Sequence, residues 1–415
     1  MVYLDWAATS PPDREILEEA FRASLGRYGN PSSAHGEGRL ASDALESARR
    51  ILLASLFPHG KPAGSIHFTG SGTEADQIPL LSLFSDFALG LKRTRGASSP
   101  PHILVSAIEH PAVFSQALHL STLGIEVQFL DPDSRGRLDP RRVAENIRPE
   151  TRLVAVMAVN NETGAVQDIE GIGKAIGERL RIPSARQPVR KPGGPAQAAG
   201  KDIAFHVDCV QALGKTDLDF LGSPAGPSSA AFSAHKLRGP KGIGALWLAS
   251  SLDVVAKGGG QEGGIRSGTE NLYGALAFAS CSVQAQTKLE AALRHARDLE
   301  KLLIQGIRAI PGAATLPLDR QPGEAAFSPY ILSASFPGLG GEVLARALSD
   351  AGIAVSTGSA CSSRKKGERR ILKAMGLDEE LSFSAIRIST GETSSPKDIE
   401  DFLSRAEDLF RHLKT

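Results

Sequence analysis

The stretch AAFSAHKLRGPKGIGALWL, residues 230–248, decides how this chain folds. Its first run, AAFSA, is short and mostly apolar, and IGALWL at 243–248 is a second run of the same kind. Both are typical of buried strands, and a Gly- and Pro-rich turn at 239–244 separates them. The stretch predicts that Lys236 follows a strand, at the sheet edge where open α/β folds bind ligands. A lysine is more often an ordinary surface residue, so its neighbours in the sequence have to decide.

Short strand-like runs alternate with helical segments along most of the chain. Several of the runs are continuously apolar, which is typical of strands covered on both faces. In the helical segment at 40–56, the residues predicted to share one apolar face are Leu40, Ala44, Leu45, Ala48, Ile51 and Leu52. This alternation predicts an α/β domain with a largely parallel sheet. The predicted strands besides 243–248 are 65–69, 103–106, 125–130, 153–159 and 203–207.

The last third of the chain has a different pattern, which predicts a smaller α+β domain. Its final helix is predicted to begin after Ser395 as the N-cap, with Pro396 at the first helical position. The segment 183–200 is rich in Pro, Gly and Ala, a composition that predicts an insertion at the surface. The other predicted elements are a helix at 282–309, a strand at 331–336, a helix at 341–351 and a strand at 386–389.

Composition narrows the class of protein. The chain has 415 residues, with 47 Lys and Arg against 46 Asp and Glu. That balance gives no overall field for nucleic acid or an anionic membrane, and no apolar run reaches the roughly 20 residues of a membrane helix. The opening MVYLDWAATSPPDRE lacks the basic and apolar regions of a secretory signal. Three widely spaced cysteines form neither a disulfide framework nor a Cys-x-x-Cys metal site, so we expect a soluble cytoplasmic protein without a metal.

An acid and a lysine stand at the ends of two predicted strands. Asp208 follows the run at 203–207, and Lys236 follows AAFSA. Pyridoxal phosphate (PLP) needs a lysine that forms a Schiff base and an acid that keeps the pyridine nitrogen protonated. The pair therefore indicates a PLP site, the alternative being that Asp208 caps the next helix.

The turn FTGSGTEAD, residues 68–76, offers a place for the cofactor phosphate. It follows the strand at 65–69 and begins a helix, so backbone N–H groups can face an anion. Gly70 and Gly72 allow the backbone to approach closely, and Thr73 adds a hydroxyl. The sequence is neither a Walker motif nor GxGxxG, and an ordinary tight turn is the alternative.

Two more predicted strands end in polar side chains. His110 follows the strand at 103–106, where an imidazole can stack on a ring and transfer protons, the alternative being a capping or solvated histidine. Asn160, Asn161 and Glu162 follow the strand at 153–159. Five strand ends thus each supply a group of the kind that PLP needs, and this convergence favours a PLP site over coincidence.

The three cysteines differ in their surroundings. Cys361 stands in STGSACSSRKKGERR, residues 356–370, among small polar residues and just before several bases. These flanks predict an exposed loop, and nearby cations favour the thiolate, the alternative being an incidental surface thiol. Cys209 beside a strand end and Cys281 in an Ala-rich segment are predicted to be buried structural residues.

Taken in order, these motifs resemble the cysteine desulfurases, which are PLP enzymes of the aminotransferase class V fold. The resemblance covers the chain from residue 3 to the final helix, apart from 183–200. It implies the type I fold of PLP-dependent transferases: a mostly parallel seven-stranded sheet in a large domain at 15–290, and a small α+β domain formed by 1–14 and 291–415. The matching stretches are YLDWAAT (3–9), YGNPSSAH (28–35), FTGSGTEAD (68–76), IEHPAV (108–113), VNNETGAVQD (159–168), HVDCVQ (206–211), FSAHKLRGPKGIGAL (232–246), GGGQEGGIRSGTEN (258–271), STGSACSS (356–363) and IRIS (386–389).

The resemblance also implies a role for each matching residue. Lys236 would form the Schiff base and move protons, His110 would stack on the ring, and Cys361 would attack the substrate sulfur. Arg387 would hold the substrate α-carboxylate in a two-pronged contact, with Asn161 beside it. The implied cofactor-binding residues are Gly72, Thr73, His110, Asn161, Asp208, Gln211, Ser233, His235, Lys236 and, toward the partner subunit, Thr269.

The implied reaction converts L-cysteine to L-alanine and leaves a persulfide on Cys361. A homodimer is implied because Thr269 would complete the neighbouring site, and the sulfur acceptor would be an iron–sulfur scaffold protein or a component of tRNA thiolation. The long loop after Cys361 resembles that of desulfurases serving iron–sulfur assembly. The alternatives are a selenocysteine lyase or another class V enzyme, and a catalytically weak sulfur-transfer scaffold.

Three positions depart from the family pattern. Gly263 stands where Arg is usual, Trp6 stands where Asn or Tyr is usual, and the segment after Cys361 is unusually basic. None of them removes a residue that the chemistry needs, so we expect activity. The departures bear on which sulfur acceptor docks.

Overall fold

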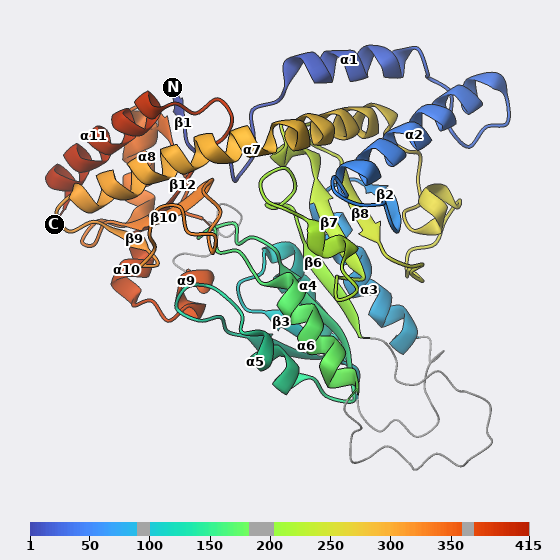
Figure 1. Cartoon of the computed structure of the whole chain (residues 1–415), viewed down its shortest axis with the longest axis horizontal. Coiled ribbons are helices and arrows are strands. Elements are labelled where there is room, and N and C mark those ends of the chain that lie inside the picture. The colour runs from blue at the N-terminus through green and yellow to red at the C-terminus, as the bar shows by residue number, and fades with distance from the viewer. Residues whose placement is uncertain (89–99, 182–202, 359–368, 415) are drawn as a thin grey trace.

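The computed structural model describes residues 1–88, 100–181, 203–358 and 369–414 (Figure 1). Cys361 and the predicted insertion at 183–200 lie outside the described residues. In the part described, the strands form one seven-stranded sheet, one three-stranded sheet and a pair of two-residue strands.

The large sheet has the strand order β2-β8-β7-β6-β5-β3-β4. Neighbouring strands from β7 to β4 are parallel, whereas β8 is antiparallel to both β7 and β2. The predicted α/β fold with a mostly parallel seven-stranded sheet is confirmed. The strand predicted at 243–248 is antiparallel because its connection to β7 is too short for a crossover. The bounds are β2 Ser65–Thr69, β3 His102–Ser106, β4 Glu126–Leu130, β5 Thr151–Met157, β6 Ala204–Asp208, β7 Ser229–Ser233 and β8 Gly244–Leu248.

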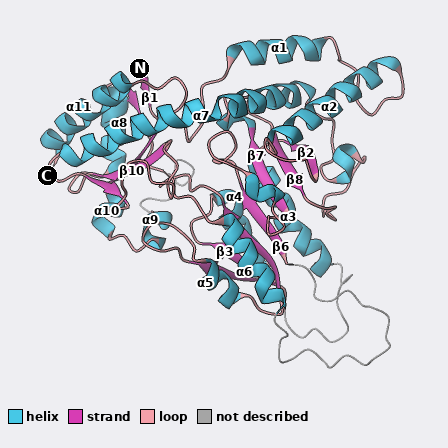
Figure 2. Cartoon of the chain, in the orientation of Figure 1, coloured by secondary structure: helices cyan, strands magenta, loops and turns pink. Residues whose placement is uncertain are grey.

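Helices cover both faces of this sheet, which is why its strands are continuously apolar (Figure 2). On β3, Ile103 and Val105 pack in one cluster with Val113 of α4, while Leu104 packs in another with Leu45 of α2. Alternate side chains of a strand point to opposite faces, so both sets are buried. The helices of this part are α1 Arg14–Leu25, α2 Gly36–Ser55, α3 Gly72–Ala88, α4 Pro111–Thr122, α5 Pro140–Asn146 and α6 Ile169–Arg181.

α2 buries part of the predicted face: Leu45, Ala48 and Leu52 are in the core, whereas Leu40 and Ile51 are not. Leu40 and Ile51 are 51% and 42% exposed. The buried residues recur every three or four positions and centre on Leu45 and Leu52. Leu40 and Ile51 lie roughly 120° around the helix from that centre. The apolar residues at 40–56 therefore occupy a wider arc than the core covers. The buried residues are Gly38, Ala41, Leu45, Ala48, Leu52 and Ser55.

The last third of the chain builds the smaller, antiparallel sheet, in the order β12-β10-β9. α11 begins as predicted: Ser395 Oγ accepts a hydrogen bond from the backbone N–H of Asp398, and the Asp398 side chain accepts one from the backbone N–H of Ser395. The elements are β1 Val2–Tyr3, β9 Ala314–Leu316, β10 Ile331–Ser335, α8 Gly341–Asp350, β11 Ile353–Ala354, α9 Arg370–Ala374, α10 Glu379–Phe383, β12 Ala385–Ser389 and α11 Pro396–Leu413.

α7, Leu272–Ala309, connects the two sheets and begins ten residues before the predicted start at 282 (Figure 1). Its first half contributes Phe278 to the core of the large sheet, and its second half contributes Leu303 to the core of the small one. The predicted domain boundary at residue 290 falls inside this helix and stays a prediction. Among the helices described, α7 included, none combines the length and apolar character that crossing a bilayer requires.

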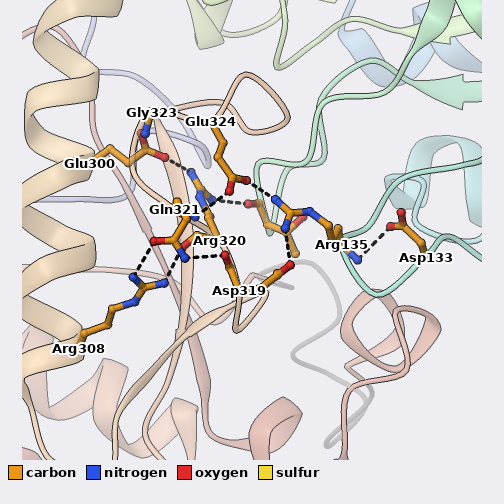
Figure 3. A network of polar contacts seen from close by, with 10 residues as sticks. Asp133, Arg135, Glu300, Arg308, Asp319, Arg320, Gln321, Gly323 and Glu324 are labelled. Carbon is orange, nitrogen blue, oxygen red and sulfur yellow. Dashed lines mark hydrogen bonds and ion pairs between the residues drawn. The ribbon is translucent and has the colours of Figure 1, made fainter.

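A buried ion pair joins α7 to the segment between β9 and β10 (Figure 3). Arg320 Nη2 lies 2.6 Å from Glu300 Oε1 of α7, and both side chains are at most 2% exposed. Arg320 Nη1 also donates to the carbonyl of Thr163, 2.8 Å away. At the edge of this network, Arg135 pairs with Asp319 and Glu324. The network thereby holds the turn that carries Asn161.

Candidate active site

A cavity of about 810 Å³ opens at the carboxyl ends of the parallel strands. Open α/β sheets bind ligands at this place because the loops that follow the strands converge there. The structure brings most of the predicted site residues to this one cavity. Those that line it are Gly72, Thr73, His110, Asn161, Asp208, Gln211, Ser233, His235, Lys236 and Arg387.

Two predicted residues are not in this set. Thr269 is exposed and does not line the cavity. Cys361 lies outside the described residues. Gly358, the last described residue before it in the sequence, does line the cavity. Cys209 and Cys281 are buried, as predicted, and burial raises the pKa of Cys281 to about 12 and that of Cys209 well above its usual value.

Lys236 reaches the cavity from a short 3₁₀ helix, Ala234–Lys236, directly after β7. Its Nζ donates to the carbonyls of Ala7 and Ala8, at 2.5 and 2.7 Å. Gln211 Nε2 donates to the same Ala7 carbonyl at 2.9 Å, and Gln211 Oε1 accepts from Lys215 Nζ at 3.1 Å. The N-terminal segment therefore holds the lysine, and the orientation of the Gln211 amide is fixed from both sides.

Asp208 ends β6 and belongs to a group of buried acids. Burial, followed by the nearby Asp76, raises the pKa of Asp208 to about 8. Asp76 is 1% exposed, and its Oδ1 lies 3.2 Å from Nε2 of His206. Burial raises the pKa of Asp76 well above its usual value and lowers that of His206 to about 4. Burial thus disfavours the charged form of both side chains, and their contact is a buried hydrogen bond.

His110 is the N-cap of α4, and its Nδ1 accepts from the backbone N–H of Ala112 at 3.2 Å. Burial, followed by the charges of Lys236, Arg370 and Arg387, lowers its pKa to about 4. The imidazole is therefore neutral near pH 7. Because Nδ1 accepts a hydrogen bond, the single proton of the neutral ring is assigned to Nε2, which is then the one donor of the ring.

The turn before α3 packs closely against the end of β7. A Cβ on Gly72 would lie 2.8 Å from Val210 Cγ2 and 3.1 Å from Ser233 Cβ, so only glycine fits without displacement. Thr73 is in the first turn of α3, where helix N–H groups lack partners within the helix. Burial, followed by Lys236, lowers the pKa of the neighbouring His235 to about 4. The N-terminal end of α3 thus lines the cavity together with the Thr73 hydroxyl and the His235 imidazole.

Arg387 extends from β12 of the small sheet into the cavity. Its Nη1 donates to the carbonyl of Asn161 at 2.9 Å, and its Nη2 lies 2.8 Å from Asp5 Oδ1. Arg387 Nε and Asn161 Oδ1 are buried and have no hydrogen-bond partner among the residues described. Buried polar atoms are rarely left unpaired, so this corner fits a polar ligand.

Asp76, Glu109 and Arg370 are among the residues in or near the cavity that were not singled out from the sequence. Asp76 lies within the quoted FTGSGTEAD, and Glu109 lies within IEHPAV. Both are almost completely buried, and burial raises the pKa of each well above its usual value. The third is Arg370, which lines the cavity beside His110. Acids and arginines are usually exposed, so only tertiary packing reveals these three.

A model of the aminotransferase class-V family matches residues 2–180 and 186–402, almost the whole chain. The chain belongs to the aminotransferase class-V family. Among its class-V relatives is "Cysteine desulfurase IscS" of Anaeromyxobacter sp. (strain Fw109-5), 32% identical over 423 residues, covering 100% of this chain and 93% of the relative. Another with the same name, from Vibrio cholerae serotype O1 (strain M66-2), is 34% identical and covers 96% of this chain and 90% of the relative.

Solved structures show the same class-V fold. A structure titled "NIFS-LIKE PROTEIN" is similar with a TM-score of 0.82 and 31% identity, covering 99% of both chains. DndA from Streptomyces lividans is similar with a TM-score of 0.68 and 28% identity, covering 93% of this chain and 99% of that one. These similarities confirm the predicted family.

Proposed function

We propose that this class-V protein is a PLP-dependent cysteine desulfurase. It converts L-cysteine to L-alanine and holds the released sulfur as a persulfide on Cys361 for transfer to an acceptor. The observation that carries the proposal is the meeting of Lys236, Asp208 and His110 in one cavity with the guanidinium of Arg387. The relatives named cysteine desulfurase support the choice of substrate.

The residues of the cavity fit PLP. Lys236 is the amine that can bind the aldehyde, and Asp208 is an acid able to pair with the ring nitrogen. The turn at Gly72 and Thr73, with Ser233 beside it, suits a phosphate because helix N-terminal N–H groups favour anions. The unpartnered Asn161 Oδ1 and Arg387 Nε, buried in the described part of the site, suit the remaining polar groups of cofactor and substrate.

Bound PLP supplies an electron sink for negative charge at the substrate Cα. Arg387 binds and orients the substrate through its α-carboxylate, because a planar guanidinium can make two parallel hydrogen bonds to it. Asp5 lies against the same guanidinium and keeps it in place before the substrate arrives. The Lys236 amine moves a proton at Cα, and the neutral His110 offers a donor at Nε2.

The sulfur step uses the thiolate of Cys361, a role that rests on the sequence. Its Sγ forms a bond to the substrate sulfur while the substrate Cβ–S bond breaks, and the bonding electron pair stays on carbon. Protonation of that carbon gives L-alanine, and the enzyme keeps the sulfur as a persulfide. No external oxidant is required, since one thiol and one cysteine become one persulfide and one alanine.

We also propose a homodimeric, cytoplasmic enzyme that serves iron–sulfur assembly or tRNA thiolation. The exposed position of Thr269, outside the cavity of its own chain, supports a role toward the phosphate of a neighbouring subunit. The division into a large domain at 15–290 and a small domain from 1–14 and 291–415 is part of the proposal. The two cores to which α7 contributes support it.

The test combines cofactor analysis with product analysis. The purified protein should absorb in the visible range, borohydride should fix the cofactor to the peptide containing Lys236, and L-cysteine should yield L-alanine. Cys361→Ala should abolish transfer of sulfur to an acceptor, whereas the matched control Cys281→Ala should retain it. Unchanged transfer by Cys361→Ala would refute the persulfide step, and turnover restricted to L-selenocysteine would favour a lyase.

A further inference from the structure

Arg370 makes contacts that the reaction described above does not use. It is the first residue of α9, and it lines the cavity with His110 and Lys236. Its neighbour Ile371 packs in one cluster with Ile108, which lies in the segment between β3 and α4. α9 is therefore anchored on the segment that leads into His110.

The Arg370 guanidinium contacts that segment directly. Nη1 donates to the carbonyl of Ala107, and Nη2 donates to the carbonyl of Glu109. Its Cζ lies 3.8 Å from the ring centroid of Phe114 in the first turns of α4. The contacts lie on both sides of His110 in the sequence, so they fix the backbone before it and the helix after it.

Only arginine suits this arrangement. A guanidinium is planar, carries donors in a fixed fork and stacks on aromatic rings, whereas a lysine ammonium is a single point of charge. A lysine at this position would keep the positive charge near His110 and lose the paired contact with the two carbonyls. The two effects of Arg370, geometry and charge, can therefore be separated by substitution.

We propose that Arg370 is a positioning residue, which fixes the backbone around His110 so that the imidazole keeps its place over the cofactor. The proposal deepens the proposed function, since it rests on His110 acting in that reaction. Arg370 itself need not contact the substrate. Through Arg370, α9 in the last third of the chain contributes to the site at the edge of the large sheet.

The test compares Arg370→Lys, Arg370→Leu and the matched control Lys373→Leu, which removes an exposed charge from the same helix. Activity is measured as kcat and KM for L-cysteine. The second readout is independent of activity: the NMR titration of His110 in the cofactor-free protein, with His110→Gln identifying its signal. Cofactor content is measured for every variant.

We expect both Arg370 variants to lose kcat by about tenfold or more, the loss typical of a displaced acid–base group, with KM and cofactor content little changed. The pKa of His110 should rise in Arg370→Leu, which removes a cation, and stay low in Arg370→Lys. Lys373→Leu should behave as the wild type. Wild-type kcat and an unmoved His110 signal in both Arg370 variants would overturn the proposal. If the wild-type protein forms no alanine, the proposed function fails; a displaced His110 NMR signal in Arg370→Lys, which keeps the charge, then still shows whether Arg370 positions the imidazole.

Discussion

Replacing Arg320 by methionine should destabilise the protein far more than removing an equally short ion pair from its surface. Arg320 is completely buried, and besides Glu300 it donates to the carbonyls of Thr163, Ile331 and Ser328, at 2.8, 2.9 and 3.0 Å. Arg320→Met leaves the Glu300 carboxylate buried, with the backbone N–H of Gly323 as its remaining hydrogen bond among the described residues. Removing one partner of a buried ion pair typically costs about 3–5 kcal/mol.

The matched control is the pair Lys397–Asp401, which has the same 2.6 Å separation but side chains that are 73% and 43% exposed. Water screens exposed pairs of this kind, so Lys397→Met should change the free energy of unfolding little. The measurement is the free energy of unfolding in urea, followed by circular dichroism. Adding Glu300→Gln to Arg320→Met removes the unpaired charge and should recover at least about 1 kcal/mol relative to the sum of the single variants. A loss below about 1 kcal/mol for Arg320→Met would show that the network does not hold the fold as reasoned.

Three further predictions concern the site and its thiols. In the cofactor-free protein, the folded-state pKa of Asp208 of about 8 lies above the usual 3.8 of an aspartate, so the folded state keeps a proton that the unfolded chain releases. The protonated Asp208 stabilises the folded state fully below about pH 4, and this stabilisation is lost as the pH rises toward 8. The thermal midpoint of unfolding should therefore fall between those pH values, and it should fall less steeply in Asp208→Asn. Gly72→Ala should weaken PLP binding by roughly tenfold in a cofactor titration, because the new Cβ would press on Val210 and Ser233. The control Gly36→Ala, whose new Cβ would meet open space, should bind PLP as the wild type does. In a Cys361→Ser background, Cys209 and Cys281 should not react with a thiol reagent until urea unfolds the protein, since both thiols are buried and their pKa values are raised; rapid labelling of the native protein would contradict this.

The architecture was predictable because apolar runs and their alternation with helices follow directly from burial on two faces. The position of the site was predictable for a related reason: parallel strands place their carboxyl ends at one edge, so Asp208, His110 and Asn161 had to come together. The face of α2 was less predictable, because Leu40 and Ile51 are as apolar as the residues that the core covers. Periodicity shows that a helix is amphipathic but not where the neighbouring surface ends.

The contributions of Asp76, Glu109 and Arg370 could not be predicted, for a different physical reason. Charged side chains are normally solvated, and nothing local in the sequence distinguishes a buried acid from an exposed one. Arg370 begins a helix of five residues, which is too short to show a periodic face. Its position in a basic segment suggested docking of a sulfur acceptor, whereas its contacts are with carbonyls inside the site.

The N-terminal segment that holds Lys236 has a consequence for the order in which the enzyme is made. The backbone N–H of Ala7 donates to Ser389 Oγ, and Asp5 pairs with Arg387, each across 382 residues of sequence. During synthesis, Asp5 and Ala7 leave the ribosome long before Arg387 and Ser389, so these contacts form late, while the large sheet encoded between them can already fold. Until then the lysine lacks the two carbonyls that hold it. The nascent protein therefore passes through a stage in which the large sheet is formed but the contacts of Lys236 with the N-terminal segment are not.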